Sequence, residues 1–171
     1  MKRPILVALA SMALVLMFSM SPSVTLAADR HFSAQLSGSE EVPARDTNAT
    51  GHANFILTKD GTELRYRFVV SNMQNVTAAH IHLGARGQNG AVVTTLFGPV
   101  APGGGKKSGL LAAGTLTSSD LTGDLAGHPL SDLVAAILAG NAYVNVHTDD
   151  GISGTGQRGD FPDGEIRGQI H

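Results

Sequence analysis

Residues 51–70 have the sequence GHANFILTKDGTELRYRFVV, in which apolar and polar side chains alternate on both sides of a short polar interruption. The interruption, Lys59-Asp60-Gly61, has the composition of a turn, because glycine supplies the positive φ that tight turns need. A period of two places the apolar side chains of each flank on one face, as in a half-buried strand. The stretch therefore predicts an antiparallel β-hairpin. Its inward positions are Ala53, Phe55 and Leu57, then Leu64, Tyr66, Phe68 and Val70.

The same period continues on either side of the hairpin and predicts a domain of short strands. We expect one helix, over residues 130–139, with Ser131 as its N-cap and Gly140 at its end. Loops are expected over residues 98–107 and 149–164, which are rich in glycine. Since no strand–helix–strand repeat occurs, the predicted fold class is all-β, an antiparallel β-sandwich or Greek-key barrel with one short helix. The other strands are expected over residues 31–36, 77–83, 91–97, 109–116, 142–148 and 165–170.

The first 27 residues depart from this pattern and have the features of a secretory signal peptide. A short basic start is followed by an apolar run over residues 5–20, and residues 25–27 (TLA) place small side chains at a cleavage site. An uncleaved anchor helix is the alternative, since such a run approaches the lower length limit for crossing a bilayer. We expect residues 1–27 to be a signal peptide and residues 28–171 to be a periplasmic or secreted domain without a membrane span.

The composition of the expected mature chain excludes several classes of function. Without residues 1–27 it keeps ten basic and 14 acidic side chains, all 21 glycines and all seven histidines. This acidic balance argues against a nucleic-acid partner, because no excess of basic side chains can replace the counterions of phosphates. The absence of cysteine excludes disulfides, thiolate metal sites and a cysteine nucleophile. Any metal ion must therefore be held by imidazole or oxygen ligands.

Two histidines one residue apart, His80 and His82, are the strongest candidate for a site. On a strand their side chains leave the same face, roughly 7 Å apart at the backbone. Two imidazoles so placed can converge on one ion of copper, zinc, iron or nickel. The expected third ligand is His147, which shares a strand face with Tyr143 and Asn145. The alternative is that the pair is a chance feature of an exposed strand or a structural hydrogen-bond pair.

The remaining polar clusters carry weaker signals. The acidic loop could hold Ca²⁺, but its spacing differs from that of an EF-hand, so a solvated loop is favoured. Glu165 and Arg167 share a strand face and could be catalytic, but a structural ion pair is favoured, with Glu40 or Glu41 as a further partner of Arg167. No Gly-x-Ser-x-Gly motif occurs, and an enzyme with a serine, cysteine or paired-acid mechanism is the least favoured class. The aspartates of the acidic loop are Asp149, Asp150, Asp160 and Asp163.

Four blocks follow one another along the mature chain: residues 36–43 (LSGSEEVP), 79–84 (AHIHLG) with 89–90 (NG), 143–148 (YVNVHT) and 164–170 (GEIRGQI). Together they resemble the CHRD domain, named after chordin, over residues 32–170. The resemblance implies an immunoglobulin-like β-sandwich. In chordin this domain lies in an extracellular antagonist of bone morphogenetic proteins, whereas the bacterial single-domain members are secreted proteins without an assigned activity.

The histidine blocks also resemble the copper site of copper/zinc superoxide dismutase, another Greek-key β-sandwich. That enzyme likewise has a His-x-His strand and a late histidine, which correspond to His80, His82 and His147. The present chain lacks its cysteine pair and a recognisable zinc loop. Because a shared fold does not establish a shared function, this resemblance implies a copper site and leaves dismutation in doubt.

We therefore expect a protein that binds a metal ion, copper before zinc, through His80, His82 and His147. A fourth ligand could come from His52. Ligating histidines commonly donate their second N–H to a nearby acceptor, which orients the ring. The side chains expected to orient the imidazoles are Asn145, Thr148 and Glu165.

The competing hypothesis is a non-catalytic extracellular module for protein binding or adhesion. Its recognition surface would be the long glycine-rich loops, and its histidines would form a structural network. The expected partner is thus a metal ion or an extracellular protein, and the oligomeric state is not predicted. We do not expect an enzyme, and copper-dependent redox chemistry is the one enzymatic activity that the predicted site leaves open.

Overall fold

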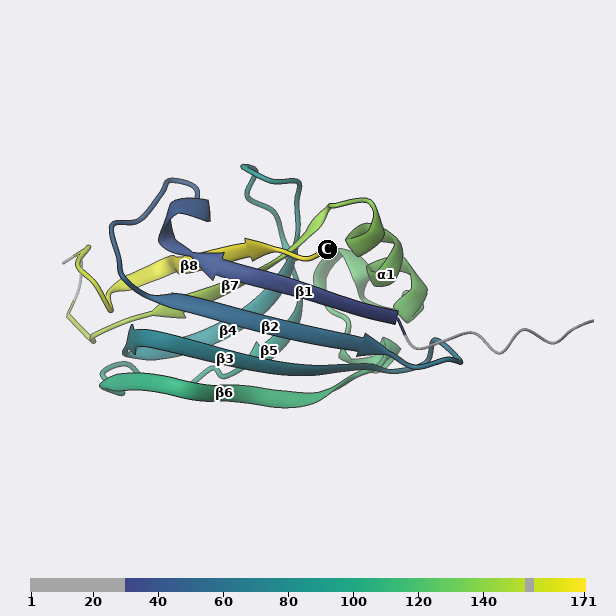
Figure 1. Ribbon diagram of the computed structural model, residues 1–171, viewed down its shortest axis with the longest axis horizontal. Helices are drawn as coiled ribbons and strands as arrows, with labels where there is room; N and C mark the ends of the chain where they lie inside the picture. The colour runs from purple at the N-terminus through teal and green to yellow at the C-terminus, as the bar shows by residue number, and fades with distance from the viewer. Residues whose placement is uncertain (1–29, 153–155) are drawn as a thin grey trace, which may run out of the picture.

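The computed structural model describes residues 30–152 and 156–171, and the predicted signal peptide over residues 1–27 lies outside them. Eight antiparallel strands form one sheet in the order β5-β4-β7-β8-β1-β2-β3-β6 (Figure 1). This confirms the predicted all-β antiparallel fold with one short helix. The elements are β1 (Arg30–Ser37), η1 (Gly38–Glu40), β2 (Thr50–Leu57), β3 (Leu64–Gln74), β4 (Val76–Leu83), β5 (Val92–Phe97), β6 (Lys106–Leu116), η2 (Ser118–Asp120), η3 (Gly123–Leu125), α1 (Leu130–Leu138), β7 (Ala142–Thr148) and β8 (Phe161–Gln169).

The sheet folds over on itself, so that its two halves face each other across one apolar core. The halves β5-β4-β7-β8 and β1-β2-β3-β6 are joined where Ser37 pairs with Arg167. At the other side the two end strands, β5 and β6, also approach one another. Removing these facing apolar surfaces from water is the main favourable contribution to folding. The core includes Ile81, Val144, Val146 and Ile166 from the first half, and Phe32, Phe55, Leu64 and Phe68 from the second.

The chain passes from one half to the other at Asn75, which lies between β3 and β4. Its φ of 49° is in the left-handed region, which asparagine tolerates better than most side chains. The side chain also stabilises the corner, since Nδ2 donates to the Gly159 carbonyl at 3.1 Å and Oδ1 accepts from the Gly105 N–H at 2.9 Å. The predicted hairpin of β2 and β3 therefore lies in one half, and β4 begins the other.

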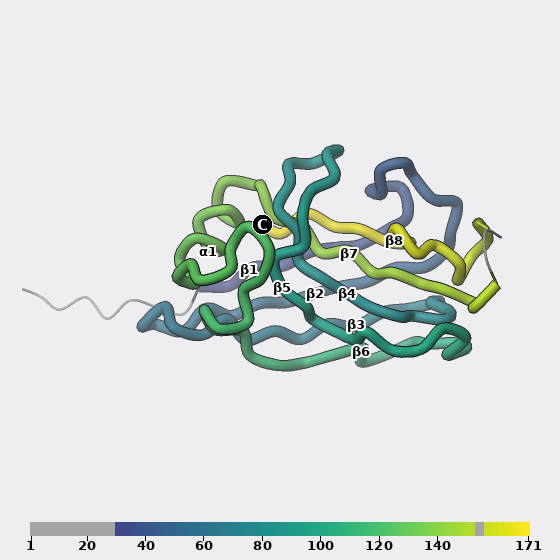
Figure 2. The backbone as a smooth tube through the Cα atoms, turned by 180° about the vertical axis from the view of Figure 1, so that it is seen from behind, coloured from purple at the N-terminus to yellow at the C-terminus, as the bar shows by residue number. Residues whose placement is uncertain are grey.

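Helix α1 covers one end of the sandwich (Figure 2). It buries side chains at helical spacing, from Leu130 to Ile137. The prediction of Ser131 as N-cap is wrong: Pro129 is the N-cap, and its carbonyl accepts the N–H of Asp132 at 3.0 Å. The predicted end is confirmed, because Gly140 follows the C-cap with a φ of 70°. No helix in the described ranges is long and apolar enough to cross a membrane.

Two strands begin earlier than the glycine-rich sequence predicts. β6 begins at Lys106, within the expected loop, because register shifts let it continue alongside β3 until Lys106 pairs with Gln74. β8 begins at Phe161, which pairs with Thr148 across a further irregularity. The proline that follows, Pro162, has no N–H to donate to the sheet, but its carbonyl has a role at the site described below.

Candidate metal centre

His80 and His82 lie on β4, and His147 lies on the adjacent antiparallel strand β7. In the register, Ala78 is opposite His147 and His80 is opposite Asn145, so His80 and His147 are diagonal neighbours on one face. Their ring centroids are 4.9 Å apart. The ring of His82 lies 5.8 Å from that of His80 and 6.0 Å from that of His147. The structure thus brings the three predicted ligands together.

The hydrogen bonds of the rings leave one nitrogen of each histidine available. Nδ1 of His82 is 2.9 Å from the Gly90 carbonyl, and Nδ1 of His147 is 2.8 Å from the Pro162 carbonyl. Because a carbonyl only accepts, each Nδ1 carries the proton, and each Nε2 of these two neutral rings keeps its lone pair. Among the residues that the structure describes, the buried nitrogens without a hydrogen-bond partner are Nδ1 of His80, Nε2 of His82 and Nε2 of His147.

The spacing of the three rings suits one metal ion. One ring nitrogen of each histidine lies within 4.8 Å of the others. Metal–nitrogen bonds of about 2.0–2.1 Å would place three such nitrogens roughly 3.3–3.6 Å apart. Small rotations of the side chains therefore suffice to close the site. Imidazole nitrogens suit copper and zinc in particular.

Burial holds the three imidazoles in the neutral form that a metal ion requires. It lowers the pKa of His80 to about 4, and the neighbouring His147 and His82 lower it further. Burial also lowers the pKa of His82 and of His147, although the hydrogen bonds to Gly90 and Pro162 act in the opposite direction. At neutral pH protons therefore compete little with a metal ion for the lone pairs.

The loop between β4 and β5 determines where the ring of His82 lies. Its residue Gly90 offers the carbonyl to His82 and donates its N–H to the Tyr143 hydroxyl at 3.1 Å. A Cβ at Gly90 would stand 1.5 Å from the Leu83 carbonyl oxygen, so this position requires glycine. The sequence marks Asn89-Gly90 as a turn, but nothing in it shows that the carbonyl of this turn orients a histidine.

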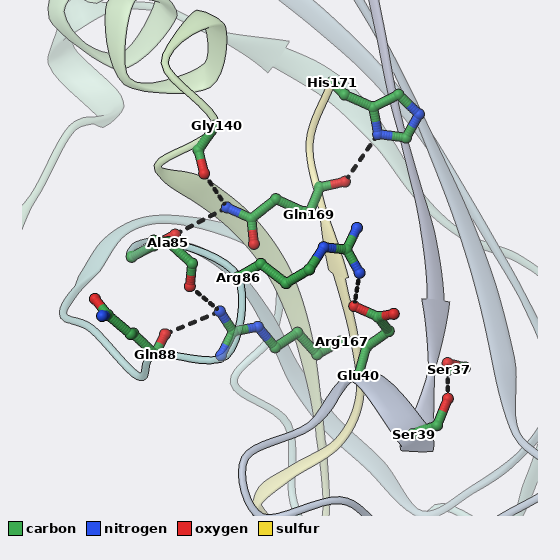
Figure 3. A network of polar contacts seen from close by, with 11 residues as sticks. Ser37, Ser39, Glu40, Ala85, Arg86, Gln88, Gly140, Arg167, Gln169 and His171 are labelled. Atoms are coloured by element: carbon green, nitrogen blue, oxygen red, sulfur yellow. Dashed lines mark hydrogen bonds and ion pairs between the residues drawn. The ribbon is translucent and has the colours of Figure 1, made fainter.

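Tyr143 and Arg167 support the ring of His82. The Tyr143 ring is stacked on His82 at 4.9 Å, and Cζ of Arg167 lies 3.5 Å from the centroid of the same Tyr143 ring. The Arg167 guanidinium donates to the Ala85 and Gln88 carbonyls at 2.9 Å each, as Figure 3 shows. These contacts fasten the β4–β5 loop over the site.

The predicted ion pairs of Arg167 are wrong. Among the described residues it forms no ion pair with Glu165, Glu40 or Glu41, because its guanidinium is directed to the loop carbonyls. Glu40 pairs with Arg86 instead (Figure 3). Carbonyl acceptors of a loop carry no side-chain signal, so the sequence pattern favoured the nearby carboxylates.

The side chains expected to orient the imidazoles have other partners in the structure. Asn145 Nδ2 donates to the Glu41 carboxylate at 3.1 and 3.3 Å. Thr148 donates to Glu165 at 2.8 Å, and Thr47 donates to the other Glu165 oxygen at 2.6 Å. Within the described part of the chain, the hydrogen bonds that hold the rings of the cluster come from the carbonyls of Gly90 and Pro162 rather than from these side chains.

The suggested fourth ligand and the acidic loop lie apart from the cluster. His52 is on β2, in the other half of the sheet, with Nδ1 at 3.5 Å from the Asn54 amide. The carboxylates of the acidic loop form a separate group made of Asp149, Asp150 and Asp160. Asp163 does not belong to that group, and its negative charge acts on His147, whose pKa it raises against the effect of burial.

Comparison with known proteins identifies one family. A family model of the CHRD domain matches residues 32–170, which include the three histidines and both carbonyls that hold them. Neither the curated proteins nor the solved structures contain a match to this chain. The match therefore covers nearly the whole described domain. By itself it assigns no ligand and no chemical activity to any residue.

Proposed function

The chain belongs to the CHRD domain family, and we propose that it is a metal-binding member located in the periplasm or outside the cell. It holds one transition-metal ion, copper before zinc, through His80, His82 and His147. The basic start, the apolar run and the small residues before position 28 support export. The partner of the histidine cluster is the metal ion. The exported protein captures this ion in the periplasm or outside the cell.

The observation that carries this proposal is the set of three buried ring nitrogens without a partner. Buried polar atoms in folded proteins are nearly always hydrogen-bonded, so three exceptions within one cluster call for an explanation. A metal ion satisfies all three lone pairs at once. The protonated Nδ1 atoms of His82 and His147, held by backbone carbonyls, leave Nε2 free as a ligand, a common arrangement for metal-binding histidine.

The alternative hypothesis, a purely structural histidine network, has less support. Such a network would require hydrogen bonds between the imidazoles or to neighbouring side chains. Among the described residues, the hydrogen bonds of these three rings are those of His82 and His147 to carbonyls, and the facing nitrogens have none. A structural role would thus leave three buried ring nitrogens without a hydrogen-bond partner among the described residues, each at a cost of about 1–3 kcal/mol.

The ligand set favours copper. Three neutral imidazoles, with no thiolate or carboxylate among them, suit copper and zinc, and of these two divalent ions a nitrogen site of given geometry holds copper more tightly. Three protein ligands leave at least one coordination position free in a tetrahedral arrangement. The site therefore suits either copper storage or redox chemistry on a ligand that enters the free position.

Metal analysis of the purified protein tests the proposal. We expect about one copper ion per chain after loading and desalting, and the double variant His80→Ala/His82→Ala should lose it. The matched control is His52→Ala/His128→Ala, which removes two imidazoles outside the cluster. Equal copper uptake by the native protein and the His80/His82 variant would show that the cluster is not the site.

A further inference from the structure

A cavity of about 340 Å³ opens beside the candidate metal centre. Its floor consists of His82 from β4 together with Tyr143 and Asn145 from β7. Its walls come from the segment after β1 and from the β4–β5 loop, which are tied together where Asn89 Nδ2 donates to the Val42 carbonyl at 2.7 Å. In Figures 1 and 2 these two segments rise on the same side of the molecule. The cavity thus reaches one of the three candidate ligands, His82, while His80 and His147 do not line it.

Asn145 lines this cavity and carries a buried hydrogen-bond acceptor. Its side chain is 4% exposed, and its Nδ2 is taken up by the Glu41 carboxylate. Its Oδ1 is buried and has no hydrogen-bond partner among the described residues. Asn145 is also directly opposite His80 in the strand register, which places it between the cavity and the cluster. A ligand that enters from the cavity and reaches this oxygen therefore gains a hydrogen bond if it carries a donor.

The charges around the cavity favour an anion once a metal ion is present. Arg45 lines the wall, where its Nε donates to the Gly164 carbonyl at 3.2 Å and its guanidinium lies 5.0 Å from the centroid of the Phe161 ring. A second guanidinium, Arg167, lies beyond Tyr143. The negative groups are the exposed Asp163 on the wall and Glu41 behind Asn145. A divalent ion added to these charges makes the site positive overall.

We infer that this cavity is the ligand-binding site of the metal centre and that it takes a small oxyanion that still carries a proton, the class to which bicarbonate belongs. The inference rests on the proposed metal site. One oxygen of the anion occupies the free coordination position, and the remaining O–H donates to Oδ1 of Asn145. Arg45 attracts the negative charge from the wall. An anion without a proton has no donor for Oδ1 of Asn145. The preference for a protonated anion therefore distinguishes this site from a general anion site.

The test compares bicarbonate with nitrate, a planar anion of the same shape and charge without a proton. Each is titrated into the copper(II)-loaded protein at pH 8, and binding is followed by the visible and EPR spectra of the metal. We expect Asn145→Leu to weaken bicarbonate binding about tenfold and to leave nitrate unchanged, as the loss of one hydrogen bond predicts. We expect Arg45→Gln to weaken both anions about fivefold, through the loss of positive charge.

The control is Thr94→Val, which removes another buried unpartnered oxygen, on β5 and outside the cavity, and should change neither titration. If Asn145→Leu does not fold, Arg45→Gln still tests the inference. An unchanged affinity of the Arg45→Gln variant for both anions overturns it. Copper loading without any spectral response to bicarbonate overturns it too and leaves the metal site in place. A protein that takes up no copper overturns both proposals.

Discussion

On β3 the outward-facing Arg65 and Arg67 are exposed to solvent, whereas on β8 the outward-facing Arg167 is 1% exposed. Arg65 pairs with Glu63 at the surface, at 2.9 Å. Arg167 instead donates to two loop carbonyls and lies against Tyr143. The three arginines occupy equivalent positions in an alternating strand, and they differ because loops cover only one of the two outer faces.

The outer face of β4, β7 and β8 is the covered face, and it carries the candidate metal centre. On β4, β7 and β8 the outward-facing His82, Asn145 and Arg167 are buried beneath the segment after β1 and the β4–β5 loop, and His80 and His147 beside them are half-buried. Burial lowers the pKa of the histidines and leaves three of their ring nitrogens without a hydrogen-bond partner among the described residues. Polar residues on the open face of β2 and β3 remain solvated. Among the described residues, the buried ring nitrogens without a hydrogen-bond partner therefore lie on the covered face.

Replacing one arginine on each face by methionine should give the largest effect on the free energy of unfolding. It should also give the largest difference between the two faces. We expect Arg167→Met to lower the free energy of unfolding by about 3 kcal/mol, because the Ala85 and Gln88 carbonyls lose their partner. Arg67→Met, on the exposed face of β3, should change it by less than about 0.5 kcal/mol. Urea denaturation of both variants measures the difference, and equal losses would contradict the structural role of the covered face.

Adding a methyl group at Gly90, in the β4–β5 loop, should have the next largest effect on stability. At Gly90 it would meet the Leu83 carbonyl oxygen at 1.5 Å, so Gly90→Ala must displace the loop and the carbonyl that holds His82. We expect a loss of about 2–3 kcal/mol in stability and weaker copper binding. The control is Gly87→Ala in the same loop, where a Cβ has open space and only the φ of 77° is unfavourable. It should cost about 1 kcal/mol and leave copper binding unchanged.

The buried carboxyl of Glu41 should make stability depend on pH. Burial raises its pKa from 4.5 to about 7, although Arg167 and Arg45 act to lower it. The folded protein therefore binds this proton more tightly than the unfolded chain, and the stability that this confers is present below pH 4.5 and lost as the pH rises through about 7.

The variant Glu41→Gln, which mimics the protonated carboxyl, isolates this contribution. It should match the native protein near pH 4 and exceed its stability at pH 8 by at most about 3 kcal/mol. Thermal or urea unfolding across this pH range provides the measurement. A constant difference between variant and native protein at all pH values would show that Glu41 does not titrate in the expected range.

The smallest effect is expected for the ion pair on the open face. Arg65 and Glu63 are 2.9 Å apart but both are largely accessible to water. Exposed pairs of this kind contribute about 0–1 kcal/mol, and salt screens them. Arg65→Ala should therefore change the free energy of unfolding by less than about 0.5 kcal/mol, with a smaller change still in high salt. A larger loss would remove the contrast between the two faces.

Much of the fold could be predicted from local patterns. The hairpin around Lys59-Asp60-Gly61, the helix that ends before Gly140 and the antiparallel strands all follow from the period of the apolar positions and from turn residues. The starts of β6 and β8 could not be predicted, because Lys106 and Phe161 join strands through long-range pairing with Gln74 and Thr148. The local glycine content of these segments favoured loops. Hydrogen bonding to distant strands made their ends part of the sheet instead.

The candidate site divides in the same way. The pairing of His80 with His82 follows from strand geometry, and His147 could be predicted from its strand and its resemblance to a family block. The carbonyls of Gly90 and Pro162 could not, since every residue has a carbonyl and only the path of the backbone decides which one faces an imidazole. The unpaired Oδ1 of Asn145 is likewise invisible to sequence patterns.

By itself, the sequence determined an all-β chain without cysteine, in which any metal must rest on imidazoles and oxygens, and it determined which strand positions face the core. Side-chain alternation and composition are local properties, so they need no knowledge of distant residues. Only the tertiary structure decided which of the two polar faces is covered. That outcome depends on loops that close over β4, β7 and β8, and it is burial beneath them that makes three histidines a candidate site.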